Sequence, residues 1–133
     1  MRDANDVDML GLCFDRSTWD RLNELHMLRL TLAPANHATD LTATLWSLFV
    51  MFREECKQGP VRVRRRTYDW TDDRQRKEHD FMTYKQDCSA ILQQCRKMRC
   101  TPEDLFMMLV HYYYWQRQRD YPKAINWTMK GEN

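Results

Sequence analysis

The chain has few of the residues that allow sharp turns, with 3 Gly and 4 Pro among 133 residues. Hairpin turns need residues that accept a positive φ, so a fold built mainly of β-hairpins is disfavoured. No apolar run approaches the roughly 20 residues that a membrane-spanning helix needs. Residues 1–6 are polar and acidic, unlike the basic and then apolar start of a signal peptide. We therefore expect one cytoplasmic domain over residues 1–133, whose 43% hydrophobic residues suffice for a core.

Signatures of catalysis and of cofactor binding are also absent. The sequence has no Gly-rich phosphate loop, no His-Glu-x-x-His pair and no nucleophile elbow. The cysteines occur singly within helical patterns, not in Cys-x-x-Cys pairs, which predicts reduced thiols without a disulfide framework or a zinc site. They are Cys13, Cys56, Cys88, Cys95 and Cys100. We expect a protein that is not an enzyme and that carries no cofactor or metal.

The spacing of apolar residues predicts an all-α fold, a single-domain bundle of four principal helices with a basic connector between the second and the third. The first helix begins at the N-cap Ser17 and ends before Pro34. The second helix runs from the N-cap Asn36 to Gly59. Residues 1–16 form an N-terminal arm or a short helix, since periodicity cannot settle so short a segment.

The third and fourth helices are predicted in the second half of the chain. The third begins at the cap residues 71–73 and continues to Met98, with Phe81 and Tyr84 on its apolar face. The fourth follows Thr101-Pro102, an N-cap followed by proline at the first helical position. The helix is expected to end near residue 120, and its first part, residues 105–115, is apolar or aromatic on every side, so we expect it to be buried on more than one side. Residues 122–133 form a C-terminal tail.

Positive charge is concentrated in the connector, residues 61–70, although the net charge of the chain is only +2. Residues 1–60 carry 6 Lys+Arg and 9 Asp+Glu, whereas residues 61–133 carry 15 and 10. Guanidiniums bind phosphates and aromatic rings stack on unpaired bases, which together favour nucleic-acid binding, to DNA or RNA. A second basic cluster ends the third helix, where cations also complement the helix dipole. The predicted nucleic-acid-binding residues are Arg62, Arg64, Arg65, Arg66, Tyr68, Trp70, Arg96, Lys97 and Arg99. The alternative is a solvated loop whose arginines pair with neighbouring carboxylates.

An aromatic run in the fourth helix predicts binding to a partner protein or to a second copy of the chain. Consecutive rings on a helix point to every side, so they cannot all face one small core. The residues are Tyr112, Tyr113, Tyr114 and Trp115. The leading hypothesis is therefore a non-enzymatic accessory or regulatory protein that binds nucleic-acid backbone and a partner, such as a small subunit of a nucleoprotein complex. The alternative is a pure protein-interaction module or inhibitor that binds no nucleic acid.

One segment has a pattern that occurs in a known family. Leu10, Leu12 and Phe14 alternate with other residues, and Asp15-Arg16-Ser17-Thr18-Trp19 then leads into a helix with Leu22 and Leu25. This segment resembles the strand and first helix of ribbon-helix-helix DNA-binding proteins. The resemblance implies a strand that pairs with that of a second copy and enters the major groove, with Met9, Gly11 and Cys13 facing the bases. A DNA-binding regulator of this kind is the second alternative.

Overall fold

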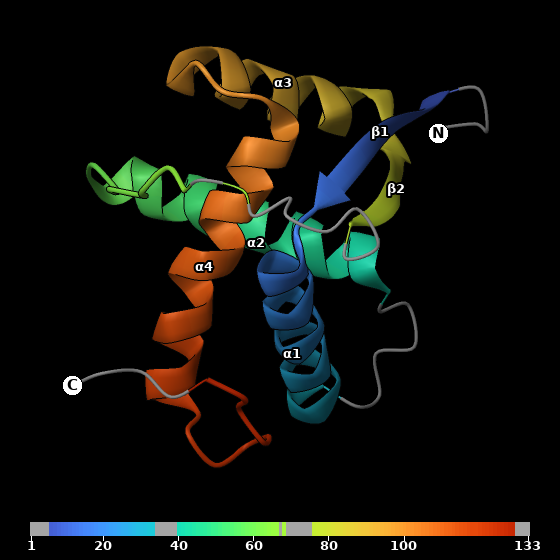
Figure 1. The fold of residues 1–133 in the computed structure, drawn as a ribbon. Coiled ribbons are helices and arrows are strands. Elements are labelled where there is room, and N and C mark those ends of the chain that lie inside the picture. The colour runs from blue at the N-terminus through green and yellow to red at the C-terminus, as the bar shows by residue number, and fades with distance from the viewer. Residues whose placement is uncertain (1–5, 34–39, 67, 69–75, 130–133) are drawn as a thin grey trace.

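The computed structural model describes residues 6–33, 40–66, 68 and 76–129, and this part of the chain forms two strands and four helices. In chain order they are β1 (Val7–Phe14), α1 (Arg16–Leu32), α2 (Leu41–Gln58), β2 (Lys77–Tyr84), α3 (Lys85–Met98) and α4 (Pro102–Asp120). Four helices were expected and are found. The fold is nevertheless not all-α, because β1 and β2 pair as an antiparallel ribbon (Figure 1).

The first two helices lie where the periodicity predicts them. In each, however, the residue that caps the N-terminus is not the predicted one. Asp15 caps α1, since its Oδ1 accepts a hydrogen bond of 3.1 Å from the backbone N of Thr18, and Ser17 lies inside the first turn. Asp40 caps α2 by accepting from the backbone N of Ala43 at 2.8 Å. The predicted cap Asn36 lies outside the described residues. In both helices a carboxylate satisfies a backbone N–H of the first turn, where the helix dipole favours negative charge.

The predicted third helix is wrong in its first half. Residues 77–84 form β2, paired with β1 so that Leu10 lies opposite Phe81, and α3 begins only at Lys85. Phe81 is fully buried and its ring centroid lies 5.4 Å from that of Phe106, whereas Tyr84 faces outward and is exposed. Pairing with β1 satisfies the backbone N–H and C=O groups on the facing edges of the two strands. If residues 77–84 formed a helix, that edge of β1 would lack its partner strand. The predicted cap at 71–73 lies outside the described residues.

Each half of the chain has the order strand, helix, helix, and the two halves interlock. β1 contacts α4 of the second half, and β2 contacts α2 of the first half. α4 also packs against α1 and α2, so the second helix of one half lies against both helices of the other (Figure 1). The first half has the order that the ribbon-helix-helix resemblance predicts. Its strand pairs with β2 of the same chain, where the resemblance implies a strand from a second copy.

Helix α4 lies at the centre of the core, in contact with α1, α2, α3 and β1, and is buried on more than one side as its apolar sequence predicts. Residues 105–111 are all buried, and Thr101 begins the helix with a capping box in which its Oγ1 accepts from the backbone N of Asp104 at 3.1 Å. The tail after α4 packs back onto the helix as far as it is described. Trp127 is buried there, with its ring edge-on to that of Tyr114 at 5.2 Å. The predicted start of this helix and its burial on more than one side are confirmed.

All five cysteines are free thiols, as the sequence predicts. Within the described ranges, no three His, Cys, Asp or Glu side chains are grouped so that they could hold a metal ion. None of the helices in this part of the chain has the length and apolar character needed to cross a membrane.

Candidate nucleic-acid interface

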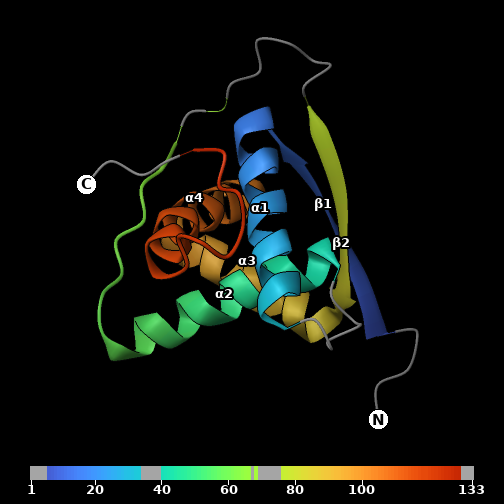
Figure 2. The same cartoon turned by 90° about the horizontal axis from the view of Figure 1, so that it is seen from below.

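The basic connector leaves α2 at Gly59 and runs beside α4. Its described residues form no helix or strand, as expected. Val61 and Val63 are half-buried and pack against the core. Arg62 and Arg64, which alternate with them in the sequence, are exposed. This alternation holds the backbone to the protein and leaves guanidiniums in solvent. Figure 2 shows the connector on the side of the molecule opposite the β-ribbon, with the helices between them.

Arg65 joins the two basic clusters that the sequence places 30 residues apart. Its Nη2 donates to the carbonyl of Met98 at 2.7 Å and also to the carbonyl of Arg99. These carbonyls end α3, where the helix dipole favours a cation and unpaired acceptors need a donor. Arg65 therefore anchors the connector to the end of α3. These hydrogen bonds engage Nη2 of the guanidinium, so Arg65 has a positioning role among the exposed arginines of the connector.

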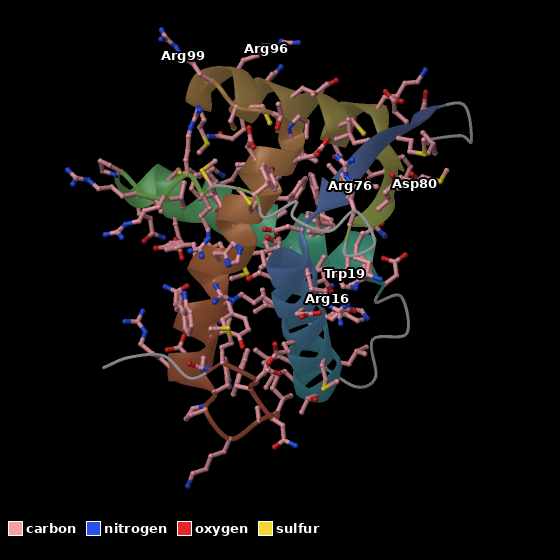
Figure 3. All side chains as sticks on the ribbon, viewed as in Figure 1. Arg16, Trp19, Arg76, Asp80, Arg96 and Arg99 are labelled. Carbon is pink, nitrogen blue, oxygen red and sulfur yellow. The ribbon has the colours of Figure 1, made fainter. Side chains whose placement is uncertain are left out.

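We name the exposed cations around this anchor the arginine face: Arg62, Arg64, Arg66, Arg96, Lys97 and Arg99. In Figure 3, Arg96 and Arg99 point outward from the end of α3. Two ion pairs join described residues, Arg16–Asp20 and Lys57–Glu54, and neither includes a residue of the arginine face. Within the described part of the chain the arginine face is thus a group of cations without paired carboxylates.

A pocket of about 340 Å³ lies between the connector and α4. Arg62, Arg64 and Arg66 line it from the connector, and Tyr112 and Trp115 line it from α4. Its described lining contains no carboxylate. The pocket therefore combines positive charge with aromatic walls.

His111 also lines this pocket and belongs to a buried polar network that links α4 to α1. Its Nδ1 lies 2.5 Å from Nη1 of Arg21, and its Nε2 lies 3.0 Å from Oγ1 of Thr18. A guanidinium can only donate, so Nδ1 accepts and Nε2 carries the proton that it donates to Thr18. Burial first, and then the charges of Arg66 and Arg21, lower the pKa of His111 to about 3. The imidazole is neutral at physiological pH and adds no charge to the pocket.

The aromatic run of α4 divides between the core and this pocket. Tyr113 and Tyr114 are completely buried within the chain, and burial raises the pKa of both phenols. The hydroxyl of Tyr114 donates to Oε1 of Glu24 at 3.1 Å. Tyr112 and Trp115 are half-buried and line the pocket. Packing inside the chain accounts for Tyr113 and Tyr114, and contact with a partner remains a prediction for the other two rings.

Of the two rings predicted to stack on bases beside the arginines, Trp70 lies outside the described residues. Tyr68 is half-buried and lines a second pocket of about 260 Å³ together with Arg65, Arg66 and Asp104. Burial and the nearby Asp104 carboxylate raise the pKa of the Tyr68 hydroxyl. Tyr68 thus lies beside the N-terminus of α4.

Sequence reasoning missed the buried network of Thr18, Arg21 and His111. One signal was present, because positions 18 and 21 lie four residues before Leu22 and Leu25 and so continue the apolar stripe of α1 toward its N-terminus. Polar residues on such a stripe indicate buried hydrogen bonds. Nothing in the sequence, however, connects that stripe with His111, 90 residues later.

The outer face of the ribbon has a different character from the arginine face. Met9, Gly11 and Cys13 lie on this face, opposite Met82, Asp80 and Glu78 respectively. Figure 3 shows Asp80 at the ribbon, and Arg76 just before β2 donates from Nε to Sγ of Cys13 at 3.0 Å. The face carries two carboxylates and apolar side chains.

Comparisons of the chain with models of protein families, with curated proteins and with solved structures find no match.

Proposed function

We propose that this protein is a non-enzymatic accessory or regulatory protein that binds the phosphate backbone of nucleic acids through its arginine face. The observation that carries the proposal is the anchoring of Arg65 to the carbonyls of Met98 and Arg99, which brings both predicted basic clusters to one surface. Either cluster alone has an ordinary explanation, as a solvated loop or as the complement of a helix dipole. Their juxtaposition, with no described carboxylate paired to the six cations, has no such explanation within the fold.

Phosphate binding accounts for the kind and the exposure of these side chains. Guanidiniums form paired hydrogen bonds with phosphate oxygens, and they lose less hydration than an ammonium does. Each neutralised phosphate releases a condensed counterion, so six contacts would give a logarithmic dependence of the affinity on salt with a slope of about −4 for single strands and about −5 for duplexes. Binding through the arginine face is therefore expected to be strong at low salt and independent of sequence.

A fluorescence anisotropy titration with labelled single-stranded and duplex oligonucleotides tests this proposal. The variant Arg62→Gln/Arg64→Gln/Arg66→Gln is compared with wild type at low salt, and its affinity is expected to fall by at least about tenfold. The control Arg16→Gln/Lys85→Gln/Lys123→Gln removes the same charge from exposed positions outside the arginine face and is expected to bind within about threefold of wild type. Absence of binding by wild type at low salt, or equal losses in both variants, overturns the proposal. The pure protein-interaction module then becomes the better account.

The paired strands favour a second candidate, a DNA-binding regulator that inserts its ribbon into the major groove. Antiparallel ribbons of other proteins read bases in this way. At the centre of the outer face Gly11, which has no side chain, lies opposite Asp80, and the carboxylates of Glu78 and Asp80 would oppose the phosphates on approach. In the groove these carboxylates could accept only from the amino groups of cytosine N4 and adenine N6. If the ribbon binds DNA, Glu78→Ala and Asp80→Ala change the affinity for duplexes in a sequence-dependent way, whereas binding through the arginine face leaves affinity unchanged or slightly higher.

A partner protein remains part of the proposal through the two half-buried rings of α4, Tyr112 and Trp115. Tyrosine and tryptophan are enriched at protein interfaces because each buries a large apolar surface. These rings adjoin the arginine face, so a partner and a nucleic acid would compete for the same surface. A pull-down from lysate treated with nuclease, repeated with excess oligonucleotide, tests whether the two kinds of binding exclude one another.

A further inference from the structure

The pocket between the connector and α4 has features that the phosphate backbone alone does not need. A groove for phosphates requires only cations on an open surface. Here Arg62, Arg64 and Arg66 line a pocket of about 340 Å³ together with the rings of Tyr112 and Trp115. That volume is at the small end of the range for pockets that hold one small molecule. The pocket therefore suits a single charged ligand unit with a flat apolar part.

The aromatic wall is held in place from within the protein. The guanidinium of Arg21 lies over the Trp115 ring, 4.6 Å from its centroid, and Tyr114 meets that ring edge-on at 5.1 Å. Tyr112 packs against the buried Tyr113 with centroids 5.0 Å apart. Both rings are thus fixed before any ligand arrives, so less conformational entropy is lost on binding than with free side chains. Each still reaches the pocket, since both are only half-buried.

The charge of the pocket selects an anion. The three arginines supply positive charge and the described lining contains no carboxylate. His111 is neutral and both of its nitrogens are occupied, by Arg21 and by Thr18, so it neither repels a phosphate nor competes for the arginines. Arg21 lies behind the wall as a further buried cation. A ligand with phosphate at one end and a flat ring at the other matches these walls.

We infer that this pocket takes one unstacked nucleotide of a single-stranded nucleic acid, with the base against Trp115 or Tyr112 and the phosphates on Arg62, Arg64 and Arg66. The inference rests on the proposed function and deepens it, because it makes single strands the substrate class. Stacking of a base on an aromatic side chain contributes independently of sequence, since every base has a ring face. A duplex keeps its bases stacked inside and can use the arginines alone. The protein is therefore selective for single strands over duplexes.

Ring substitutions test the inference separately from the proposed function. In anisotropy titrations with a labelled thymidine 12-mer and a 12-base-pair duplex, Trp115→Leu and Tyr112→Leu are expected to weaken single-strand binding by roughly 5- to 100-fold and to leave duplex binding within about threefold. Trp115→Phe keeps a ring and is expected to retain most of the affinity. Trp46→Leu, which removes a half-buried ring of α2 outside the pocket, serves as the control. Circular dichroism melts establish that each variant is folded.

A second measurement on wild-type protein does not depend on variants. A 5-iododeoxyuridine oligonucleotide forms photochemical cross-links to aromatic rings that stack on it, and these are expected at Tyr112 or Trp115 when peptides are mapped by mass spectrometry. Cross-links that map only outside α4, or ring variants that are folded and bind single strands as wild type does, overturn the inference while the arginine dependence still supports the proposed function. If neither nucleic acid binds, both fail together.

Discussion

Acidification to about pH 5 is expected to destabilise the fold through His111. In the folded protein the pKa of this imidazole is about 3, below its ordinary value, because the side chain is buried beside Arg66 and Arg21. In the unfolded chain it takes up a proton below about pH 6.5. Between these values the unfolded state binds one proton more than the folded state, so the free energy of unfolding falls as the pH falls. From a neutral pH to pH 5, the loss attributable to His111 is about 2 kcal/mol.

Urea unfolding of wild type and of His111→Gln at about pH 7.5 and pH 5 measures this contribution. Glutamine can still accept from Arg21 or donate to Thr18, but it does not titrate. The variant is expected to be less stable than wild type by about 1–3 kcal/mol at the higher pH, and the difference should shrink by about 2 kcal/mol at pH 5. His26→Gln is a control, because this histidine is more exposed and its pKa is lowered less strongly. Equal pH dependence in wild type and His111→Gln would refute the assignment of a neutral, buried imidazole.

Three further predictions concern the fold. Phe81→Ala empties a fully buried site in β2 and is expected to lower the free energy of unfolding by about 3–5 kcal/mol. Met82→Ala, on the exposed face, should lower it by less than about 0.5 kcal/mol. Similar losses in both variants would contradict the strand register. Thr101→Ala breaks the capping box of α4 and is expected to cost about 1 kcal/mol in chemical denaturation, against almost nothing for the exposed Thr31→Ala. Arg65→Gln releases the connector from α3, so backbone amides at 61–66 should exchange with deuterium faster than in wild type, and unchanged exchange would show that the hydrogen bonds to Met98 and Arg99 do not hold the connector.

The helical part of the fold could be predicted because its signals are local. Thr101 and Pro102 define the start of α4 through capping and a fixed φ, and both effects act within one turn. The N-caps of α1 and α2 could not be predicted because several Asp, Asn, Ser and Thr residues precede each helix, and these residue types are favoured almost equally as N-caps. Asp15 and Asp40 are selected by where the chain enters the fold.

The second strand could not be predicted because its stability comes from a partner 70 residues away. Phe81, Tyr84 and Cys88 are spaced as on a helix, and only pairing with β1 favours the extended form of residues 77–84. The resemblance of residues 10–25 to a strand followed by a helix did indicate β1, but it implied a strand from another copy as partner.

The candidate site was predictable in composition and not in arrangement. The arginines of the connector stand out in the sequence, yet their position beside Arg96 and Arg99 depends on the anchoring of Arg65, which is a contact between distant segments. The aromatic run shows the same limit. Helical spacing predicts that the four rings face different sides of α4. Which of them is buried depends on packing against α1 and the tail, which cover Tyr114 and leave Trp115 at the pocket.

The dependence of nucleic-acid affinity on salt tests the central claim most directly. The logarithm of the association constant of wild type for a single-stranded oligonucleotide, plotted against the logarithm of the salt concentration, is expected to have a slope of about −4. Replacing Arg62, Arg64 and Arg66 by Gln should bring that slope to about −2, while the Arg16, Lys85 and Lys123 control keeps the wild-type value. A slope near zero in wild type, or the same slope in wild type and in the connector variant, would contradict binding of phosphates by the arginine face.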